Sequence, residues 1–212
     1  MAEVGSIGAV LQREWHELLA SLVPARERSP LVLPPARRMP FRPAALFAEL
    51  EEVRFAWSEL RSLALDEHAD RYVNPEWTVK DLLAHLASWA REFRSQVETA
   101  FRGESFDYAI PYALSVVGPN QWNQKEVAQR RGRSLDEILD EFDAETARLQ
   151  DLVLEMPEQG LSAERSFPMA PSGDPDVTVR STCAMQVLGK CRHDRYHIGQ
   201  MRSWLAALRT NK

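Results

Sequence analysis

The chain has 212 residues, of which 44% are hydrophobic and 27% charged, which suits a soluble globular domain with one extension. The formal net charge of −5 disfavours nucleic-acid binding, which needs a basic surface, so we expect no nucleic-acid partner. No apolar run approaches the roughly 20 residues that cross a bilayer, and the start lacks a secretory signal pattern. With only two cysteines there is no disulfide framework. We therefore expect a cytoplasmic protein without a membrane partner.

The first 43 residues are predicted to be distinct from the rest. Apolar residues at a spacing near 3.6 predict a short amphipathic helix over 7–22. Residues 24–43 carry six prolines and five arginines, a composition that excludes a helix and a central strand. We interpret this stretch as an extended arm. The predicted domains are residues 1–43, a helix with a proline-rich arm, and residues 44–212, a helical bundle.

Two helices of that bundle are predicted before residue 103. Residues 44–66 carry an apolar stripe at steps of three and four, with glutamates off the stripe. The next helix begins after Thr78, where Asp81 three residues later completes a capping-box pattern. Its apolar face includes Leu82, Leu86 and Trp89, and His85 lies on that same face.

The second half of the chain predicts two further long helices. Residues 103–133 are interrupted by glycine and proline, with a short helix expected at 120–130. Ser134 and Glu137 form a capping box that opens the third long helix, which Pro157 ends. Residues 157–177 read as a long loop, either a lid or a plain crossover. The last helix is expected from Thr178 to about residue 208. We find no strand pattern, so the predicted fold class is all-α, a four-helix bundle.

Three histidines are candidate metal ligands. His193 and His197 are four residues apart, one turn along a helix, so both rings can reach one point. His85 lies on the apolar face of a different helix. Three imidazoles with an open position are typical of a catalytic divalent-metal site, and imidazole suits zinc, nickel, copper and iron alike. The protease pattern His-Glu-x-x-His is absent, because no glutamate follows His193.

Other polar residues are candidates to support this site. Asp81, one turn before His85, is predicted to orient its ring. Gln200, three residues after His197, is predicted to bond a metal-bound water or to cap the pocket. Asp194 is expected to face solvent, since it points about 100° away from His193. Cys191 is expected to be buried packing rather than a nucleophile.

The ordered motifs resemble the DinB/YfiT-like superfamily, which includes mycothiol-dependent maleylpyruvate isomerase N-terminal domains and ClbS/DfsB-like bundles. The resemblance is carried by segment 77–89, by Trp122-Asn123 followed by segment 133–137, and by His193-x3-His197-x-x-Gln200, and it covers about residues 44–209. It implies a four-helix bundle, frequent homodimers and one divalent metal ion, zinc or nickel, on three histidines, which map onto His85, His193 and His197.

The resemblance also implies a function. In the thiol-transferase members the metal activates a low-molecular-weight thiol that attacks an electrophilic small molecule; in a hydrolase version it would activate water. Candidate substrate-binding residues are Trp122, Asn123, Tyr196 and Gln200. The alternatives are a ClbS/DfsB-like bundle that sequesters a small molecule or toxin without catalysis, and a bundle that serves only as a dimerising module.

Overall fold

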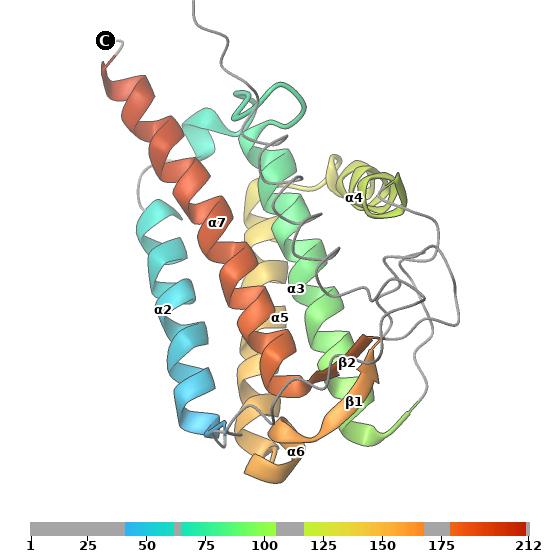
Figure 1. Cartoon of the computed structure of the whole chain (residues 1–212). Helices are drawn as coiled ribbons and strands as arrows, with labels where there is room; N and C mark the ends of the chain where they lie inside the picture. The colour runs from blue at the N-terminus through green and yellow to red at the C-terminus, as the bar shows by residue number, and fades with distance from the viewer. Residues whose placement is uncertain (1–40, 62–64, 105–116, 168–178, 211–212) are drawn as a thin grey trace, which may run out of the picture. The chain divides into compact units, whose positions relative to one another are not determined.

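Four long helices form the core of the described chain, as expected from the sequence. The computed structural model describes residues 41–61, 65–104, 117–167 and 179–210. Its long helices are α2 (Pro43–Arg61), α3 (Val79–Arg102), α5 (Leu135–Glu155) and α7 (Cys183–Thr210), which lie side by side in Figure 1. The all-α prediction is confirmed. The predicted helix at 7–22 and nearly all of the arm lie outside the described residues, so the domain division stays a prediction.

Helix α2 shows how the apolar periodicity becomes a core. Five of its side chains recur at steps of three and four and are buried, namely Leu46, Leu50, Val53, Trp57 and Leu60. This stripe packs against α5 and α7. Removing a stripe of this width from water is the main contribution that holds a helix in a bundle.

Both predicted capping boxes are present. Thr78 Oγ1 accepts a hydrogen bond from the Asp81 backbone N at 3.1 Å, and Asp81 Oδ2 accepts from the Thr78 N at 3.3 Å. Ser134 and Glu137 make the same reciprocal pair at the start of α5. Each box satisfies two backbone N–H groups that a helix start leaves without partners. Helix α3 ends at Gly103, whose φ of +70° is the left-handed conformation that glycine adopts without strain.

The shorter elements differ from the sequence interpretation. Helix α4 (Val117–Arg130) begins earlier than the predicted 120, and a 3-10 turn, η1 (Leu65–His68), follows α2. The predicted loop 157–177 contains α6 (Glu158–Ser162) and strand β1 (Glu164–Phe167), which pairs antiparallel with β2 (Val179–Thr182). Thus the expectation of no strand was wrong. Thr178, the predicted cap, lies outside the described residues, and α7 begins only at Cys183.

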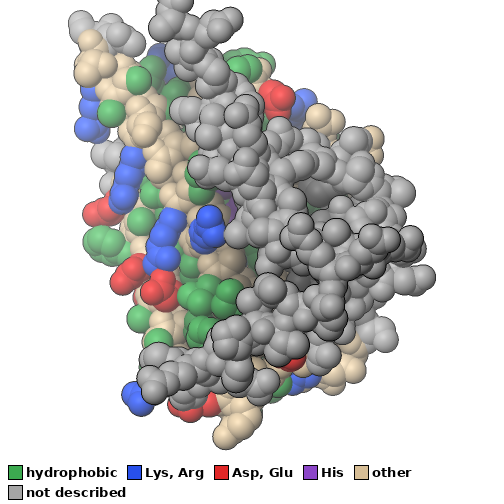
Figure 2. Space-filling model, in the orientation of Figure 1, with side chains coloured by type: hydrophobic (Ala, Val, Ile, Leu, Met, Phe, Trp, Pro, Cys, Tyr) green, Lys and Arg blue, Asp and Glu red, His purple; other side chains and the backbone are tan. Residues whose placement is uncertain are grey.

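Charged side chains connect the helices at the surface. Arg195 of α7 donates to Glu49 of α2 at 2.5 Å, and Arg202 of α7 donates to Glu59 of α2 at 3.0 Å. Figure 2 shows basic and acidic side chains mixed along the face that α7 occupies in Figure 1. Exposed pairs of this kind add little stability each. No helix in the described ranges is long and apolar enough to cross a membrane.

Candidate metal centre

Helices α3 and α7 bring the three predicted histidines together. His85 comes from α3, and His193 and His197 come from α7, which packs against α3. One ring nitrogen from each histidine lies within 4.8 Å of the other two. The two Nε2 atoms of His85 and His193 are 3.1 Å apart, although 108 residues separate them along the chain. The cluster predicted from spacing on two helices therefore forms in the fold.

The spacing of the donors suits a metal ion. In a tetrahedral site with zinc–nitrogen bonds near 2.0–2.1 Å, two donors lie roughly 3.3 Å apart. The 3.1 Å between His85 and His193 is close to that separation. The ring centroids of the three pairs lie 4.7 to 5.1 Å apart, and no pair is stacked face to face. Three histidines so arranged are positioned to hold one metal ion.

Burial keeps two of these rings neutral. Burial, together with the neighbouring His193, lowers the pKa of His197 to about 3. Burial also lowers the pKa of His85 well below its usual value, with His193 and His197 adding to the effect. A neutral imidazole keeps a lone pair on one nitrogen, which a metal ligand needs. Both rings thus remain ready to bind a metal at neutral pH.

Hydrogen bonds at Nδ1 turn the Nε2 atoms of the two α7 histidines toward the centre. His193 Nδ1 lies 3.2 Å from Asp194 Oδ1, and His197 Nδ1 lies 2.7 Å from Gln200 Oε1. Because a carboxylate and an amide oxygen can only accept, both Nδ1 atoms carry the hydrogen. The Gln200 amide in turn donates to the Tyr196 hydroxyl at 2.8 Å. Gln200 therefore holds His197 in the described structure.

His85 is held by aromatic packing instead. Among the residues that the structure describes, its buried Nδ1 has no hydrogen-bond partner of ordinary geometry. Its ring lies 4.5 Å from that of Trp77 and 6.3 Å from that of Trp89. We expected Asp81 to orient this ring. Asp81 instead caps α3 and accepts a hydrogen bond from Arg131 at 3.1 Å.

Trp122 and Asn123 reach the centre through Trp89. The Trp122 ring is buried and meets Trp89 edge-on with centroids 5.1 Å apart. Asn123 Oδ1 accepts a hydrogen bond from Trp89 Nε1 at 2.9 Å. The Trp89 ring in turn lies 5.6 Å from that of His193. In this structure the two α4 residues therefore position a wall of the centre.

An ion network around the buried Arg130 holds α4 in that place. Arg130 of α4, only 3% exposed, donates to Glu126 at 2.7 Å and to Glu141 of α5 at 2.6 Å. Arg91 of α3 donates to the same Glu126 at 2.6 Å. The network thus links α4 to both neighbouring helices, so Trp122 and Asn123 have a fixed place beside α3.

The sequence interpretation missed a buried pair beside His193. Lys190 and Asp194 are both 0% exposed, and Lys190 Nζ lies 2.5 Å from Asp194 Oδ2. We expected Asp194 to face solvent, and that expectation was wrong. The signal was present as Lys190-x3-Asp194, a spacing that places opposite charges on one helical face.

The two cysteines play no nucleophilic part in this geometry. Both are buried and unbridged. Burial raises the pKa of Cys183, and it raises the pKa of Cys191 to about 12. A thiol of that kind stays protonated at neutral pH and is unreactive. This agrees with the expectation that Cys191 is packing.

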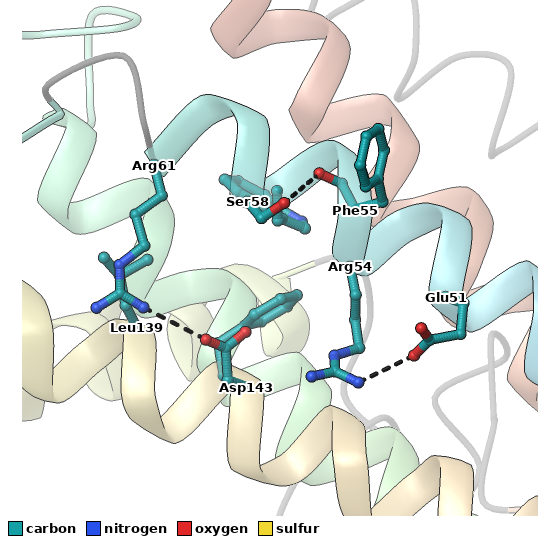
Figure 3. A pocket seen from close by; sticks show the side chains of 9 residues that line it. Glu51, Arg54, Phe55, Ser58, Arg61, Leu139 and Asp143 are labelled. Carbon is teal, nitrogen blue, oxygen red and sulfur yellow. Dashed lines mark hydrogen bonds and ion pairs between the residues drawn. The ribbon is translucent and has the colours of Figure 1, made fainter.

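A separate hollow lies between α2 and α5. It has a volume of about 290 Å³, and Arg54, Arg61 and Asp143 are among its lining residues. Figure 3 shows Arg54 turned toward Glu51 and Arg61 toward Asp143, so both guanidinium groups already have carboxylate partners. None of the three histidines lines this hollow. It is therefore distinct from the metal centre.

The lowered histidine pKa values predict acid sensitivity of the metal-free protein. His197 has a folded pKa of about 3 and an unfolded pKa near 6.5, so the unfolded chain binds more protons between those values. The resulting stability is complete above pH 6.5 and is lost as the pH falls toward 3. Between pH 7.5 and 5 we expect protonation of His197 alone to lower the free energy of unfolding by about 2 kcal/mol. Protonation of His85 lowers it further. Urea unfolding after chelation would measure this.

A matched variant tests the cause of that acid sensitivity. His197→Gln removes the titrating ring, so its free energy of unfolding should fall less between pH 7.5 and 5 than that of the unsubstituted chain. An equal fall in both proteins would contradict the assignment to His197.

Comparisons with known proteins bear on the family of the chain. A family model described as "Mycothiol maleylpyruvate isomerase N-terminal domain" matches residues 50–186, more than half of the chain. This range includes His85 and ends before His193 and His197. No curated protein matches the sequence.

A solved structure shares the fold. The crystal structure of the mycothiol-dependent maleylpyruvate isomerase is similar with a TM-score of 0.57 at 16% sequence identity. The match covers 76% of this chain and 61% of that one. At this identity the likeness shows the fold.

Proposed function

The chain belongs to the mycothiol maleylpyruvate isomerase N-terminal domain family, and from this premise we propose that it is a divalent-metal-dependent enzyme. In this proposal His85, His193 and His197 hold one zinc or nickel ion. The reaction transfers a low-molecular-weight thiol, of the mycothiol class that the family name gives, to an electrophilic small molecule.

One observation carries the proposal. Three imidazoles from two helices converge within 4.8 Å, and two of them direct a bare Nε2 to the common point. Three nitrogen ligands leave a coordination position for another molecule. A bound divalent ion would lower the pKa of a thiol at that position and so supply a thiolate at neutral pH.

The side chains around the centre suit the second substrate. Trp89 and Phe93 lie with ring centroids 5.6 and 6.4 Å from that of His193, so they offer an apolar surface to a carbon skeleton. Tyr196 accepts the Gln200 amide hydrogen, which leaves its own hydroxyl hydrogen free to donate to a substrate oxygen. Burial raises the pKa of Tyr196, so that hydrogen is retained at neutral pH.

The reaction is balanced without a further reagent. The sulfur–hydrogen bond breaks and a carbon–sulfur bond forms at the electrophilic carbon. In an addition the π bond of the acceptor breaks and the proton ends on the neighbouring carbon. In a substitution the bond from carbon to the leaving group breaks and the proton accompanies that group. No residue of the centre needs to change oxidation state.

The test compares metal-free protein with protein reloaded with one equivalent of zinc or nickel. Each is incubated with a panel of low-molecular-weight thiols, mycothiol included, and with electrophilic acceptors such as activated alkenes. Mass spectrometry should show that the thiol adduct forms faster with the reloaded protein than with the metal-free protein or in buffer alone. His197→Ala protein treated identically serves as the control.

Other outcomes point elsewhere. Metal binding with ester or amide cleavage, but no adduct, would favour hydrolysis. Tight binding of an electrophile without turnover, with or without metal, would favour a ClbS/DfsB-like sequestering role. Failure of the unsubstituted protein to bind any divalent metal would overturn the proposal.

A further inference from the structure

Lys190 and Asp194 form an ion pair in the interior of the bundle. Both side chains are fully buried, and Lys190 Nζ is 2.5 Å from Asp194 Oδ2. Lys190 also lies over the ring of Phe142 on α5, with Nζ 4.9 Å from the ring centroid. Taking two charges out of water carries a desolvation cost that a hydrophobic pair of the same size would not incur. Stability alone therefore does not account for this pair.

The two oxygens of Asp194 have different partners. Oδ2 faces Lys190, whereas Oδ1 lies 3.2 Å from His193 Nδ1. With Oδ2 paired to the Lys190 ammonium, the other carboxylate oxygen faces the imidazole as a hydrogen-bond acceptor.

His193 has more need of such a partner than the other two rings. His193 is partly exposed, whereas His85 and His197 are buried. Packing therefore restricts its ring less. The Asp194 carboxylate, which the buried Lys190 holds in place, restricts the His193 ring where packing does not.

We infer that Asp194, fixed by Lys190, is the positioning residue of His193. It sets the His193 tautomer that directs Nε2 to the centre. It also makes His193 the strongest of the three nitrogen donors. A carboxylate partner raises the basicity of a metal-binding imidazole more than a neutral one. His197 has the neutral amide of Gln200, and the Nδ1 atom of His85 has no hydrogen-bond partner of ordinary geometry among the described residues. The role toward a metal rests on the function proposed above.

The test uses two double variants, because a single substitution leaves a buried charge without its partner. Lys190→Met with Asp194→Leu removes both charges and the acceptor. Lys190→Met with Asp194→Asn removes both charges but keeps an amide oxygen that can accept from Nδ1. Circular dichroism and urea unfolding establish that each variant is folded.

The first readout is the His193 tautomer in metal-free, ¹⁵N-histidine-labelled protein. In the unsubstituted chain Nδ1 should carry the hydrogen. In the Met/Leu variant the ring loses its acceptor and should take up the Nε2–H form, while the His197 tautomer stays unchanged. The Met/Asn variant should restore the Nδ1–H form. A merely structural pair would not produce this reversal.

The second readout is zinc affinity, measured by competition with a chromophoric chelator. The Met/Leu variant should bind zinc about 10- to 100-fold more weakly, the range typical for loss of such an outer partner. The Met/Asn variant should recover part of that loss. An unchanged His193 tautomer together with an affinity within twofold would overturn the role of Asp194. The tautomer is measured without metal, so its result is independent of the proposed function. The proposed function fails only if the unsubstituted chain binds no divalent metal.

Discussion

Replacing His197 with alanine is expected to reduce the bound metal from about one ion per chain to none. The change removes one of the three donors found among the described residues, and two histidines do not complete the ligand set of a catalytic site. His197 is also the ring whose Nε2 is directed inward by Gln200. Elemental analysis after zinc reconstitution and desalting would give the stoichiometry.

A histidine elsewhere in the chain provides the control for this change. His68 lies in η1, where its ring meets that of Trp204 edge-on with centroids 5.6 Å apart. His68→Ala should keep the full metal content. If His197→Ala also keeps about one ion per chain, the three-histidine centre is wrong.

Replacing Lys190 with methionine should lower the free energy of unfolding by about 3–5 kcal/mol. The substitution leaves the Asp194 carboxylate fully buried without its counter-charge, and such a charge is poorly solvated in the interior. A loss of this size is a large fraction of the stability of a typical domain. Urea unfolding of the metal-free protein at pH 7.5 would measure it.

Two comparisons show whether burial is the cause. Arg202→Met breaks an exposed ion pair with Glu59, whose side chains are 53% and 51% exposed, and should cost less than about 1 kcal/mol. The Lys190→Met and Asp194→Leu double variant removes both charges and should recover most of the loss. A cost for Lys190→Met no greater than that for Arg202→Met would contradict the argument.

The long helices were predictable because their signals are local. The stripe from Leu46 to Leu60 and the capping boxes at Thr78 and Ser134 each lie within one element, and each is present in the structure. The histidine cluster could be predicted because His85 lies on the apolar face of one helix, and His193 and His197 lie on one face of another helix. The pairing of β1 with β2 could not be predicted in this way, since four-residue strands are too short to show a clear alternating pattern.

The supporting residues depended on contacts between elements. We expected Asp194 in solvent because it is the next residue after His193 and so points in another direction. However, α7 packs against both α2 and α3, so its buried face is wide enough to include both His193 and Asp194. Asp81 has the right spacing to reach His85, yet Arg131 after α4 pairs with it instead. Sequence spacing shows which groups share a face, whereas competition among partners from other helices appears only in the fold.

The separation of His85 from His193 by 108 residues has a consequence for biogenesis. While the chain is being synthesised, the nascent polypeptide carries a single ligand of the centre until α7 emerges. The other two then arrive together, on the last helix of the described chain. Bringing them to α3 closes a long loop, a slow step relative to local helix formation. If the proposed centre binds its metal, loading would therefore be a late event of maturation, after the fold has formed, and the metal would not guide the first steps of folding.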